Sequence, residues 1–393
     1  MNPDVIVIGG GVAGCACAAR LAERGLRVRL LERGPLASGA SGRNQGGLLP
    51  SPEPACGQIY PEGIEYYRQL AGEGRIDFQL RRHGYLLVAE APAELARAAE
   101  HGRALAGLGF PASTVDSDRL RELAPGLAPG LAGGVVVDGA YALHPVLAVA
   151  ALADRARQAG AQISTGVLVR GLQSSGGRVS GVVTDGGPLP AGAVVLAAGP
   201  WSRSLALQAG SDAPVSGTRG WLVRTAPVPE LPFRHTMMQS TWHGADGLRG
   251  HTLPALADYG EPGAAGPTAR VIFSLQPLPS GEAVLGSSSS TAISIGPGHH
   301  EVAGAIARTA VRFAPVLAKV AVRAAWSGVR PMTPDGLPLF GPAPGVAGLW
   351  LATGYGIDGL PLAPATARML ARHLVDGHPD PAAGAFDPAR FAG

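Results

Sequence analysis

Three glycines near the start of the chain, and one acid further on, have the residue types and spacing to bind a nucleotide. Gly9, Gly11 and Gly14 fit the pattern G-x-G-x-x-G, and Glu32 follows Gly14 by 18 residues. Glycines at these places allow a tight turn, a close approach of a pyrophosphate to the backbone, and close packing of helix against strand. A carboxylate at position 32 can accept hydrogen bonds from ribose hydroxyls. These residues therefore predict a site for an adenine dinucleotide.

The flanking sequence supplies the elements that such a turn needs. The apolar run 4–8 predicts a strand buried on both faces, 15–24 predicts a helix that ends at Gly25, and 26–31 predicts a second strand. The N-terminus of that helix would offer unpaired N–H groups to phosphates. Strand, glycines, helix, strand and acid in this order favour a dinucleotide site over an ordinary glycine turn, but they do not distinguish NAD from FAD.

Length and composition narrow the class of protein. The chain has 393 residues, enough for two domains or one large interrupted domain, and 46% of its residues are hydrophobic. Its net charge is only +3 and its basic residues are scattered, so no nucleic-acid surface is expected. No apolar stretch reaches the ~18 residues of a membrane span. Because the first strand begins near residue 4, we expect no secretory signal and a cytoplasmic protein.

The cysteines do not predict redox or metal chemistry. Cys15 and Cys17 fall on one helix, where residues two apart point away from each other, so we interpret them as small packing residues. Cys56 is the third cysteine, and no metal-ligand spacing appears around the pair His299-His300. No metal site is predicted.

Further along the chain, predicted strands and helices alternate and then change character. We predict helices at 60–71, 93–108, 117–123, 145–159, 301–313 and 362–375, and strands at 85–89, 162–165, 167–169, 178–184, 193–199, 221–223, 271–275, 283–286 and 349–353. The pattern predicts an α/β fold, in which a Rossmann-like nucleotide-binding domain (1–80, 138–215 and 326–393) is interleaved with an antiparallel-sheet domain (81–137 and 216–325). The segment 227–268 is interpreted as a lid, a subunit contact or a solvated insertion.

Several separated motifs together resemble the D-amino-acid oxidase-like family of FAD-dependent oxidoreductases, in particular its glycine oxidases, sarcosine oxidase β subunits, and amino-acid or opine dehydrogenase flavosubunits. The resemblance covers most of the chain. The motifs are the glycine turn with Glu32-Arg33, the loop 40–47 (ASGRNQGG), His144-Pro145, the strand and turn 194–202 (VVLAAGPWS), the stretch 328–336 (GVRPMTPDG), and the turn 354–359 (GYGIDG) with 362–366 (LAPAT).

The resemblance implies bound FAD. It places the pyrophosphate at 9–14, the ribose on Glu32, the adenine on the backbone of Val167, the ribityl chain and ring along 41–47, and the N1/O2 edge of the flavin at the turn 354–360. Some members attach FAD through a cysteine where this chain has Gly328, so non-covalent FAD is expected. The cofactor-binding residues implied are Gly9, Gly11, Val12, Ala13, Gly14, Glu32, Arg33, Ala40, Ser41, Arg43, Asn44, Gln45, Gly46, Gly47, Val167, Ala198, Gly199, Trp201, Gly328, Gly354, Gly356, Ile357, Asp358, Gly359 and Leu360.

The resemblance also implies a reaction. It is the oxidation of the C–N bond of an amino acid or N-substituted amino acid, by hydride transfer from Cα to flavin N5, giving an imine that hydrolyses to an oxo acid. Arg330 matches the arginine that holds the substrate carboxylate, with a structural bridge between domains as its alternative role. Tyr355 is the second residue expected at the catalytic centre.

Relatives often carry a polar residue at Ile357 and a substrate-facing tyrosine within 273–275, and both are missing here. We therefore expect a more apolar pocket formed by Tyr355, Trp221 and Phe273, and a substrate other than glycine.

The electron acceptor and the assembly stay open. Lys319 is the only lysine, and its predicted helix is badly placed for promoting a reaction with oxygen, which favours an acceptor protein over oxygen. One alternative is a flavin-bearing subunit of a heteromeric amino-acid, opine or proline-type dehydrogenase, active only with its partners. Another is a flavoprotein acting on a biosynthetic intermediate that is not an amino acid. Either a homo-oligomer or a hetero-oligomer is compatible with the sequence.

Overall fold

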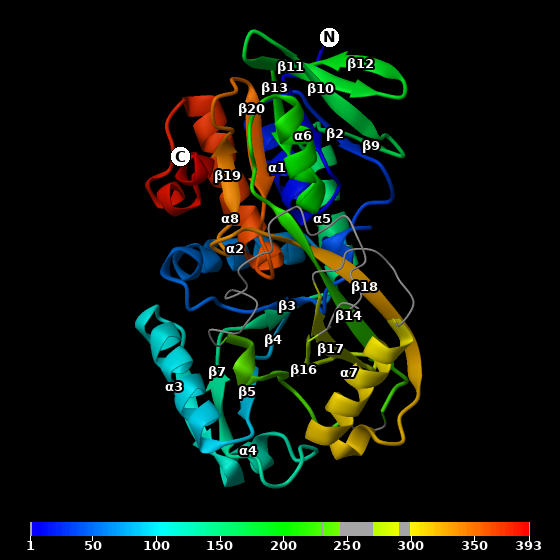
Figure 1. The fold of residues 1–393 in the computed structure, drawn as a ribbon, viewed down its shortest axis with the longest axis vertical. Helices are drawn as coiled ribbons and strands as arrows, with labels where there is room; N and C mark the ends of the chain where they lie inside the picture. Colours follow the sequence, from blue (N-terminus) through cyan, green and yellow to red (C-terminus); the bar gives the residue numbers. More distant parts are fainter. Residues whose placement is uncertain (1, 229–230, 244–269, 291–298, 393) are drawn as a thin grey trace, which may run out of the picture.

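The fold is built on two large sheets that lie one above the other in Figure 1. The computed structural model describes residues 2–228, 231–243, 270–290 and 299–392. A six-stranded sheet has the order β19-β20-β13-β1-β2-β9, and an eight-stranded sheet has the order β18-β14-β17-β16-β15-β5-β7-β6. The first carries the nucleotide-binding turn, and the second is expected to carry the substrate side of the site.

The six-stranded sheet is parallel except for β19, which runs antiparallel to β20. Val5 and Val7 face one hydrophobic core with α1, α5 and α8, whereas Ile6 and Ile8 face another with β10, β11 and α6. This two-residue alternation explains why β1 is apolar at every position. The elements of this part are β1 (Val5–Ile8), α1 (Val12–Glu23), β2 (Val28–Glu32), α5 (Pro145–Gln158), β9 (Gln162–Thr165), β10 (Val169–Ser175), β11 (Arg178–Thr184), β12 (Gly187–Pro190), β13 (Ala193–Leu196), α6 (Ser202–Gln208), β19 (Leu339–Pro342), β20 (Leu349–Thr353) and α8 (Gly359–Asp376).

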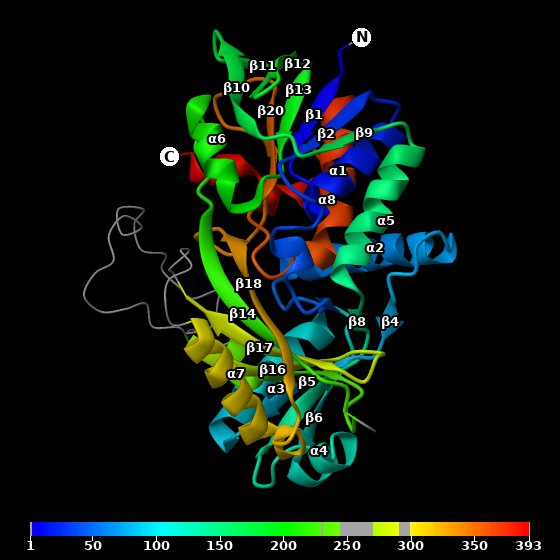
Figure 2. The same cartoon turned by 90° about the vertical axis from the view of Figure 1, so that its right-hand side faces the viewer.

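In the eight-stranded sheet only the β15–β5 pair is parallel. One face packs on α4 and α7, where the rings of Phe273 and Phe313 stack with centroids 4.6 Å apart. The opposite face looks toward the nucleotide-binding part, and α3 covers its far end (Figure 2). The elements are β5 (Tyr85–Ala89), α3 (Pro92–Gly107), β6 (Ala112–Asp116), α4 (Ser117–Leu123), β7 (Gly133–Val137), β14 (Ser216–Thr225), β15 (Thr236–Gln239), β16 (Arg270–Pro277), β17 (Ala283–Ser289), α7 (His299–Phe313) and β18 (Val322–Met332).

Helix α2 and a small sheet lie between the two large sheets. The small sheet has the order β3-β8-β4, and α2 crosses closely over α8. These elements are β3 (Gly47–Leu48), α2 (Pro54–Gly72), β4 (Arg81–Arg82) and β8 (Tyr141–Ala142); the short 3₁₀ segments are Ala40–Gly42, Gly199–Trp201, Ser240–His243, Pro315–Leu317, Pro381–Phe386 and Pro388–Phe391.

Several sequence expectations differ from the structure. The strand expected at 167–169 is present only at Val169, where β10 begins. Helix α2 begins at Pro54, six residues earlier than expected, because a proline at the first helical position needs no N–H partner. Strand β18 was not expected at all, since it contains Gly328 and Pro331; it forms because it pairs with β14 along its length. Lys319 lies in an exposed turn rather than in a helix.

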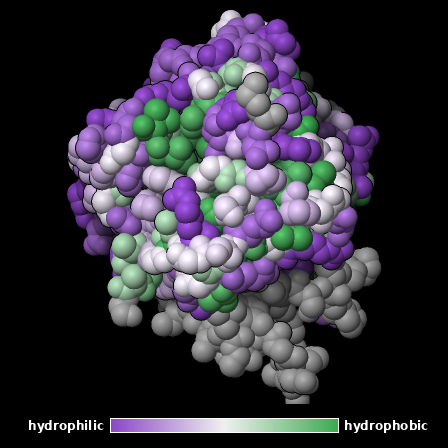
Figure 3. Space-filling model, turned by 90° about the horizontal axis from the view of Figure 1, so that it is seen from above, coloured by the Kyte–Doolittle hydropathy of each residue, from purple (hydrophilic) through white to green (hydrophobic). Residues whose placement is uncertain are grey.

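Across the ranges that the structure describes, no helix is both long enough and apolar enough to cross a bilayer. Seen from above, hydrophobic residues form small patches among hydrophilic ones (Figure 3). Most of the segment 227–268, including His251 and Tyr259, lies outside the described residues.

Candidate active site

A cavity of about 440 Å³ opens at the carboxyl ends of the parallel strands and extends to the antiparallel sheet. Its lining includes Ile8, Glu32 and Thr353 from the parallel sheet, and Leu222 and Ser274 from the antiparallel sheet. Small-molecule sites have volumes of roughly 300–1,000 Å³ and occur at this edge of open α/β sheets. The cavity therefore has the size and place of a ligand site.

The glycine turn is shaped for a ligand at one end of the cavity. A Cβ on Gly14 would lie 1.9 Å from the carbonyl oxygen of Gly9, so only glycine allows α1 to start this close to β1. Gly11 is the N-cap of α1 and offers no side-chain hydrogen bond. The hydroxyl of Ser41 replaces that cap by accepting a hydrogen bond from the Val12 N–H at 2.9 Å. The remaining N–H groups of the first turn are left for an anion.

Glu32 is fixed by the turn that it faces. Its carboxylate accepts the N–H of Gly10 at 2.6 Å and the N–H of Gly34 at 2.8 Å, one on each oxygen. Each carboxylate oxygen has a second lone pair, and Glu32 lines the cavity. The acid is thus rigidly held and keeps the capacity to accept hydroxyl donors.

Arg33 and Trp201 close the same end of the cavity. The guanidinium of Arg33 stacks over the indole ring at 3.9 Å from its centroid, and Trp201 is 45% exposed.

The Val167 N–H donates to the Glu32 carbonyl at 2.9 Å, so only the carbonyl of Val167 is left for an adenine. Val169, which sequence analysis did not single out, also lines the cavity.

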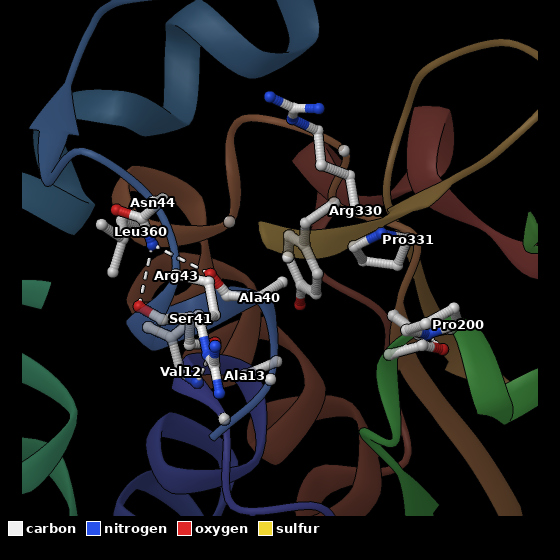
Figure 4. Close-up of a pocket in the computed structure, with 18 of the residues that line it drawn as sticks. Val12, Ala13, Ala40, Ser41, Arg43, Asn44, Pro200, Arg330, Pro331 and Leu360 are labelled. Carbon is white, nitrogen blue, oxygen red and sulfur yellow. Dashed lines mark hydrogen bonds between the residues drawn. The ribbon is translucent and has the colours of Figure 1, made fainter. Parts of the chain in front are cut away.

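The loop 40–47 is held by its own polar side chains. Asn44 Nδ2 donates to the carbonyls of Ala40 and Ser41, and Asn44 Oδ1 accepts from the Gly46 N–H (Figure 4). Gln45 Nε2 reaches the antiparallel sheet and donates to Ser274 Oγ at 2.8 Å. The loop therefore connects the two halves of the site.

The turn before α8 forms a further part of the cavity wall, beside the glycine turn and the loop 40–47. Gly356 donates to the carbonyl of Pro331 at 2.8 Å, and Tyr67 donates to the carbonyl of Leu360 at 3.0 Å. A Cβ on Gly63 of α2 would lie 1.8 Å from the carbonyl oxygen of Pro361. Helix α2 thus fixes the N-terminus of α8 against the cavity, where its dipole favours negative charge.

Arg330 lies at the other end of the cavity from Val12 and Ala13 (Figure 4). Its Nη1 donates to the carbonyl of Ser288 at 3.1 Å and its Nη2 to Ser287 Oγ at 2.9 Å. Burial lowers the pKa of Arg330 to about 10, which leaves it protonated at neutral pH. Among the described residues no carboxylate forms an ion pair with this guanidinium. A partly buried cation with donors to spare at the wall of a cavity is suited to bind an anionic group.

The prediction of an apolar pocket formed by Tyr355, Trp221 and Phe273 is partly wrong. Trp221 and Phe273 do not line the cavity but pack with the α7 side of the sheet, because they alternate with the cavity-facing residues Leu222 and Ser274. Tyr355 lines the cavity with its ring, and its hydroxyl lies 2.8 Å from Thr366 Oγ1. Burial raises the pKa of Tyr355, so it offers no acid or base near neutrality.

Most residues singled out from the sequence converge on this cavity. All the candidate cofactor residues line it except Gly14, Gly46 and Gly354, which shape the backbone behind it. Gly220, Thr236 and Ser287 also line the cavity and were not predicted. Their only signal in the sequence is the alternation of side chains along a strand, and the sequence does not tell which face of the strand meets the cavity. In the portion of the chain that is described, no group of three or more His, Cys, Asp or Glu side chains could hold a metal.

A nucleotide-binding turn, a parallel sheet and a cavity that continues to a partly buried arginine define a dinucleotide-dependent oxidoreductase. The chain belongs to the DAO family of FAD-dependent oxidoreductases, whose family model matches residues 4–373. The site fits that cofactor, because the Gly9–Gly14 cradle would be filled by any Cβ and the cavity extends well beyond the pyrophosphate turn.

Relatives and solved structures agree with this family. The chain is 29% identical to the glycine oxidase of Pseudomonas aeruginosa, over 100% of this chain and 99% of that protein. It is 29% identical to the D-amino acid dehydrogenase of Rhizobium rhizogenes, over 78% of this chain and 67% of that protein. The crystal structure of glycine oxidase from Geobacillus kaustophilus has a TM-score of 0.83 at 25% identity, covering 100% of both chains.

Proposed function

We propose that this FAD-dependent oxidoreductase oxidises the C–N bond of an amino acid or N-substituted amino acid. The observation that carries the proposal is Arg330, a partly buried guanidinium without a carboxylate partner among the described residues, which lines the cavity opposite the nucleotide turn. A planar guanidinium binds a carboxylate through two parallel hydrogen bonds and so fixes the position of the adjacent Cα. The names of the relatives, glycine oxidase and D-amino acid dehydrogenase, support a substrate of this class.

The roles of the chain follow from the two ends of the cavity. Glu32, Arg33 and Trp201 would hold the adenosine part, and the first turn of α1 the pyrophosphate. The loop 40–47 and the N-terminus of α8 would flank the isoalloxazine ring, where the helix dipole stabilises negative charge. Bound FAD supplies the two-electron acceptor. Arg330 would bind and orient the substrate, and Tyr355 would serve as a wall.

We also propose that FAD is bound non-covalently. None of the three cysteines lines the cavity, and burial raises the pKa of Cys15 and of Cys17 to about 12. Such thiols are unreactive. Acid precipitation should therefore leave yellow FAD in the supernatant, and a yellow pellet would contradict this point.

Anaerobic flavin reduction tests the main proposal. The purified protein, yellow with FAD, should bleach on addition of some D- or L-amino acid, N-methylated amino acid or opine. Arg330→Ala should keep the flavin spectrum and lower kcat/KM for reduction by at least about 30-fold, since removing one partner of a buried charge pair costs 2–5 kcal/mol. Arg323→Ala, on the exposed part of the same strand, is the matched control. Equal activity of Arg330→Ala and wild type would refute the assignment.

A further inference from the structure

Hydroxyl groups line the cavity on the face of the antiparallel sheet next to Arg330. Ser287 lies on β17, Ser274 on β16 and Thr236 on β15, and each is buried, with exposed fractions of 4%, 2% and 1%. Ser287 already accepts a hydrogen bond from Arg330. Ser274 and Thr236 each keep part of their hydrogen-bonding capacity. Because buried polar groups need partners, what these two offer to the cavity limits what can bind there.

Thr236 offers only an acceptor. Gln276 Nε2 donates to the carbonyl of Pro277 at 3.2 Å, which turns Gln276 Oε1 toward Thr236 Oγ1 at 2.6 Å. An amide oxygen only accepts, so the Thr236 hydroxyl must donate to it. His83 Nε2 lies 2.8 Å from the same hydroxyl oxygen and must therefore be the donor. One lone pair of Thr236 remains for the cavity.

Ser274 offers a donor. Gln45 Nε2 donates to Ser274 Oγ at 2.8 Å and contacts the carbonyl of Val284 at 3.4 Å, which fixes the nitrogen of this amide toward the serine. Ser274 is thus an acceptor toward Gln45, and its own O–H remains to donate.

The spacing of the two hydroxyls fits a single small polar group. Ser274 is directly opposite Met238 on β15, so Thr236 is its diagonal neighbour. The Cα atoms of diagonal neighbours on one face of a sheet lie ~7–8 Å apart and their Cβ atoms lie somewhat closer, so one small ligand group can reach both side chains. Two hydrogen bonds of about 2.8 Å and the roughly 2.2 Å between the oxygen and nitrogen of an amide cover a comparable distance. A carboxamide can therefore accept from Ser274 and donate to Thr236 at once.

The charges around the cavity disfavour an ionised group at this place. The charged side chains that line it within the described ranges are Glu32, Arg33, Arg43, Arg330 and Asp358, and none of the acids comes from the antiparallel sheet. A cationic group would have no counter-charge there, and the Arg81 guanidinium lies behind the wall, donating to the carbonyl of Pro277 at 3.4 Å. A carboxylate could not donate to Thr236.

We propose that the pocket selects an amino acid whose side chain carries a primary carboxamide. Arg330 holds the α-carboxylate, Ser274 donates to the side-chain carbonyl and Thr236 accepts from the amide N–H. This assignment rests on the proposed function and names the substrate class within it. An apolar side chain of the same size would leave the O–H of Ser274 without an acceptor and the remaining lone pair of Thr236 unused. A site built to hydrogen-bond a polar group discriminates strongly against an isostere that lacks it.

Near-isosteric substrate pairs test the proposal. The kcat/KM for anaerobic flavin reduction is compared for asparagine with leucine and for glutamine with methionine, in both enantiomers. Wild type should prefer the amide of at least one pair by about tenfold or more. Thr236→Val and Ser274→Ala should each lower that preference by roughly 2- to 12-fold, the value of one hydrogen bond. Thr236→Ser should restore it. Thr114→Val and Ser113→Ala, on exposed positions of β6, are the matched controls and should leave it unchanged.

The possible results distinguish a failure of the carboxamide assignment from a failure of the proposed function. A preference for leucine and methionine, or variants that change both members of a pair equally, would overturn the carboxamide assignment while leaving amino-acid oxidation intact. Reduction of the flavin by glycine or alanine, with no higher kcat/KM for asparagine or glutamine, would also overturn the carboxamide assignment alone. Failure of every amino acid to reduce the flavin would overturn the proposed function and this assignment with it.

Discussion

The guanidinium of Arg330 lies directly on the backbone of Gly220. A Cβ at position 220 would come within 2.3 Å of Arg330 Nη1 and 2.6 Å of its central carbon. Gly220 is paired with Gly328 across β14 and β18, so neither strand places a side chain between the arginine and the sheet. The absence of a side chain at position 220 is what lets this cation reach the cavity from an adjacent strand.

Gly220→Ala should therefore act like a change in Arg330 itself. The added methyl group must displace the guanidinium, so KM for the amino acid should rise by about tenfold or more while FAD stays bound. Steady-state kinetics together with the flavin absorbance measure the two effects separately. Gly107→Ala, at the end of α3 where a Cβ would meet nothing within 4 Å, is the control. A variant with unchanged KM would contradict the role given to this contact.

A substitution in α2 should alter the cofactor site from a distance. Gly63→Ala would place a Cβ 1.8 Å from the carbonyl of Pro361 and push α8 away from the cavity. We expect weaker FAD binding and a lower melting temperature. Gly72→Ala in the same helix has open space, and it should stabilise the protein by about 0.5–1 kcal/mol. Thermal unfolding with and without added FAD distinguishes the two, and equal behaviour would show that the close crossing of α2 and α8 is unimportant.

The stacking of Arg33 on Trp201 at the nucleotide end of the cavity predicts that removing the indole ring has a small effect on the affinity for FAD. Trp201→Ala removes the ring under Arg33, and a cation–π contact at an exposed position contributes ~0.5–1 kcal/mol. The dissociation constant of FAD, measured by reconstituting the apoprotein, should rise by about 2- to 5-fold. Trp201→Phe should recover part of the loss, whereas an unchanged constant in Trp201→Ala would exclude the pair from cofactor binding.

His83 predicts a pH dependence of stability. Burial, with the nearby charges of Arg81 and His235, lowers the pKa of His83 to about 4. The unfolded chain then binds a proton near pH 6.5 that the folded chain does not, so stability is lost as the pH falls from 6.5 toward 4. After allowance for partial exposure the effect is ~1 kcal/mol.

The melting temperature of wild type should consequently fall more between pH 7.5 and pH 5 than that of His83→Gln. The glutamine amide can still donate to Thr236 but does not titrate in this range. An equal fall in the melting temperature of both proteins would show that groups other than His83 cause the acid sensitivity.

The sequence contained most of the nucleotide half of the site, because a turn between β1 and α1 is a local feature. Gly9, Gly11, Gly14 and Glu32 are close in the chain, and their spacing reflects one unit of strand and helix. The cap of α1 was not predictable in this way: Ser41 reaches Val12 from 29 residues away. That contact depends on tertiary packing rather than on a local pattern.

Much less of the proposed substrate half of the site could be predicted from the sequence. Arg330 was found through a motif, but Gly220, Ser274 and Thr236 come from other strands whose order is not written in the chain. A shift of one residue in facing exchanges Phe273 for Ser274, and this is why an apolar pocket was expected where the structure has hydroxyl groups. Tyr355 lies at the cavity as expected, but its hydroxyl is engaged with Thr366.

The placement of β20 beside β13, and of α8 beside α1, has a consequence for biosynthesis. The first glycine turn leaves the ribosome early, yet the walls that complete its cavity include residues within 352–361, which follow much later in the same chain. A nascent chain therefore cannot complete the walls around the flavin until these residues have been made, and loading of the prosthetic group follows their synthesis.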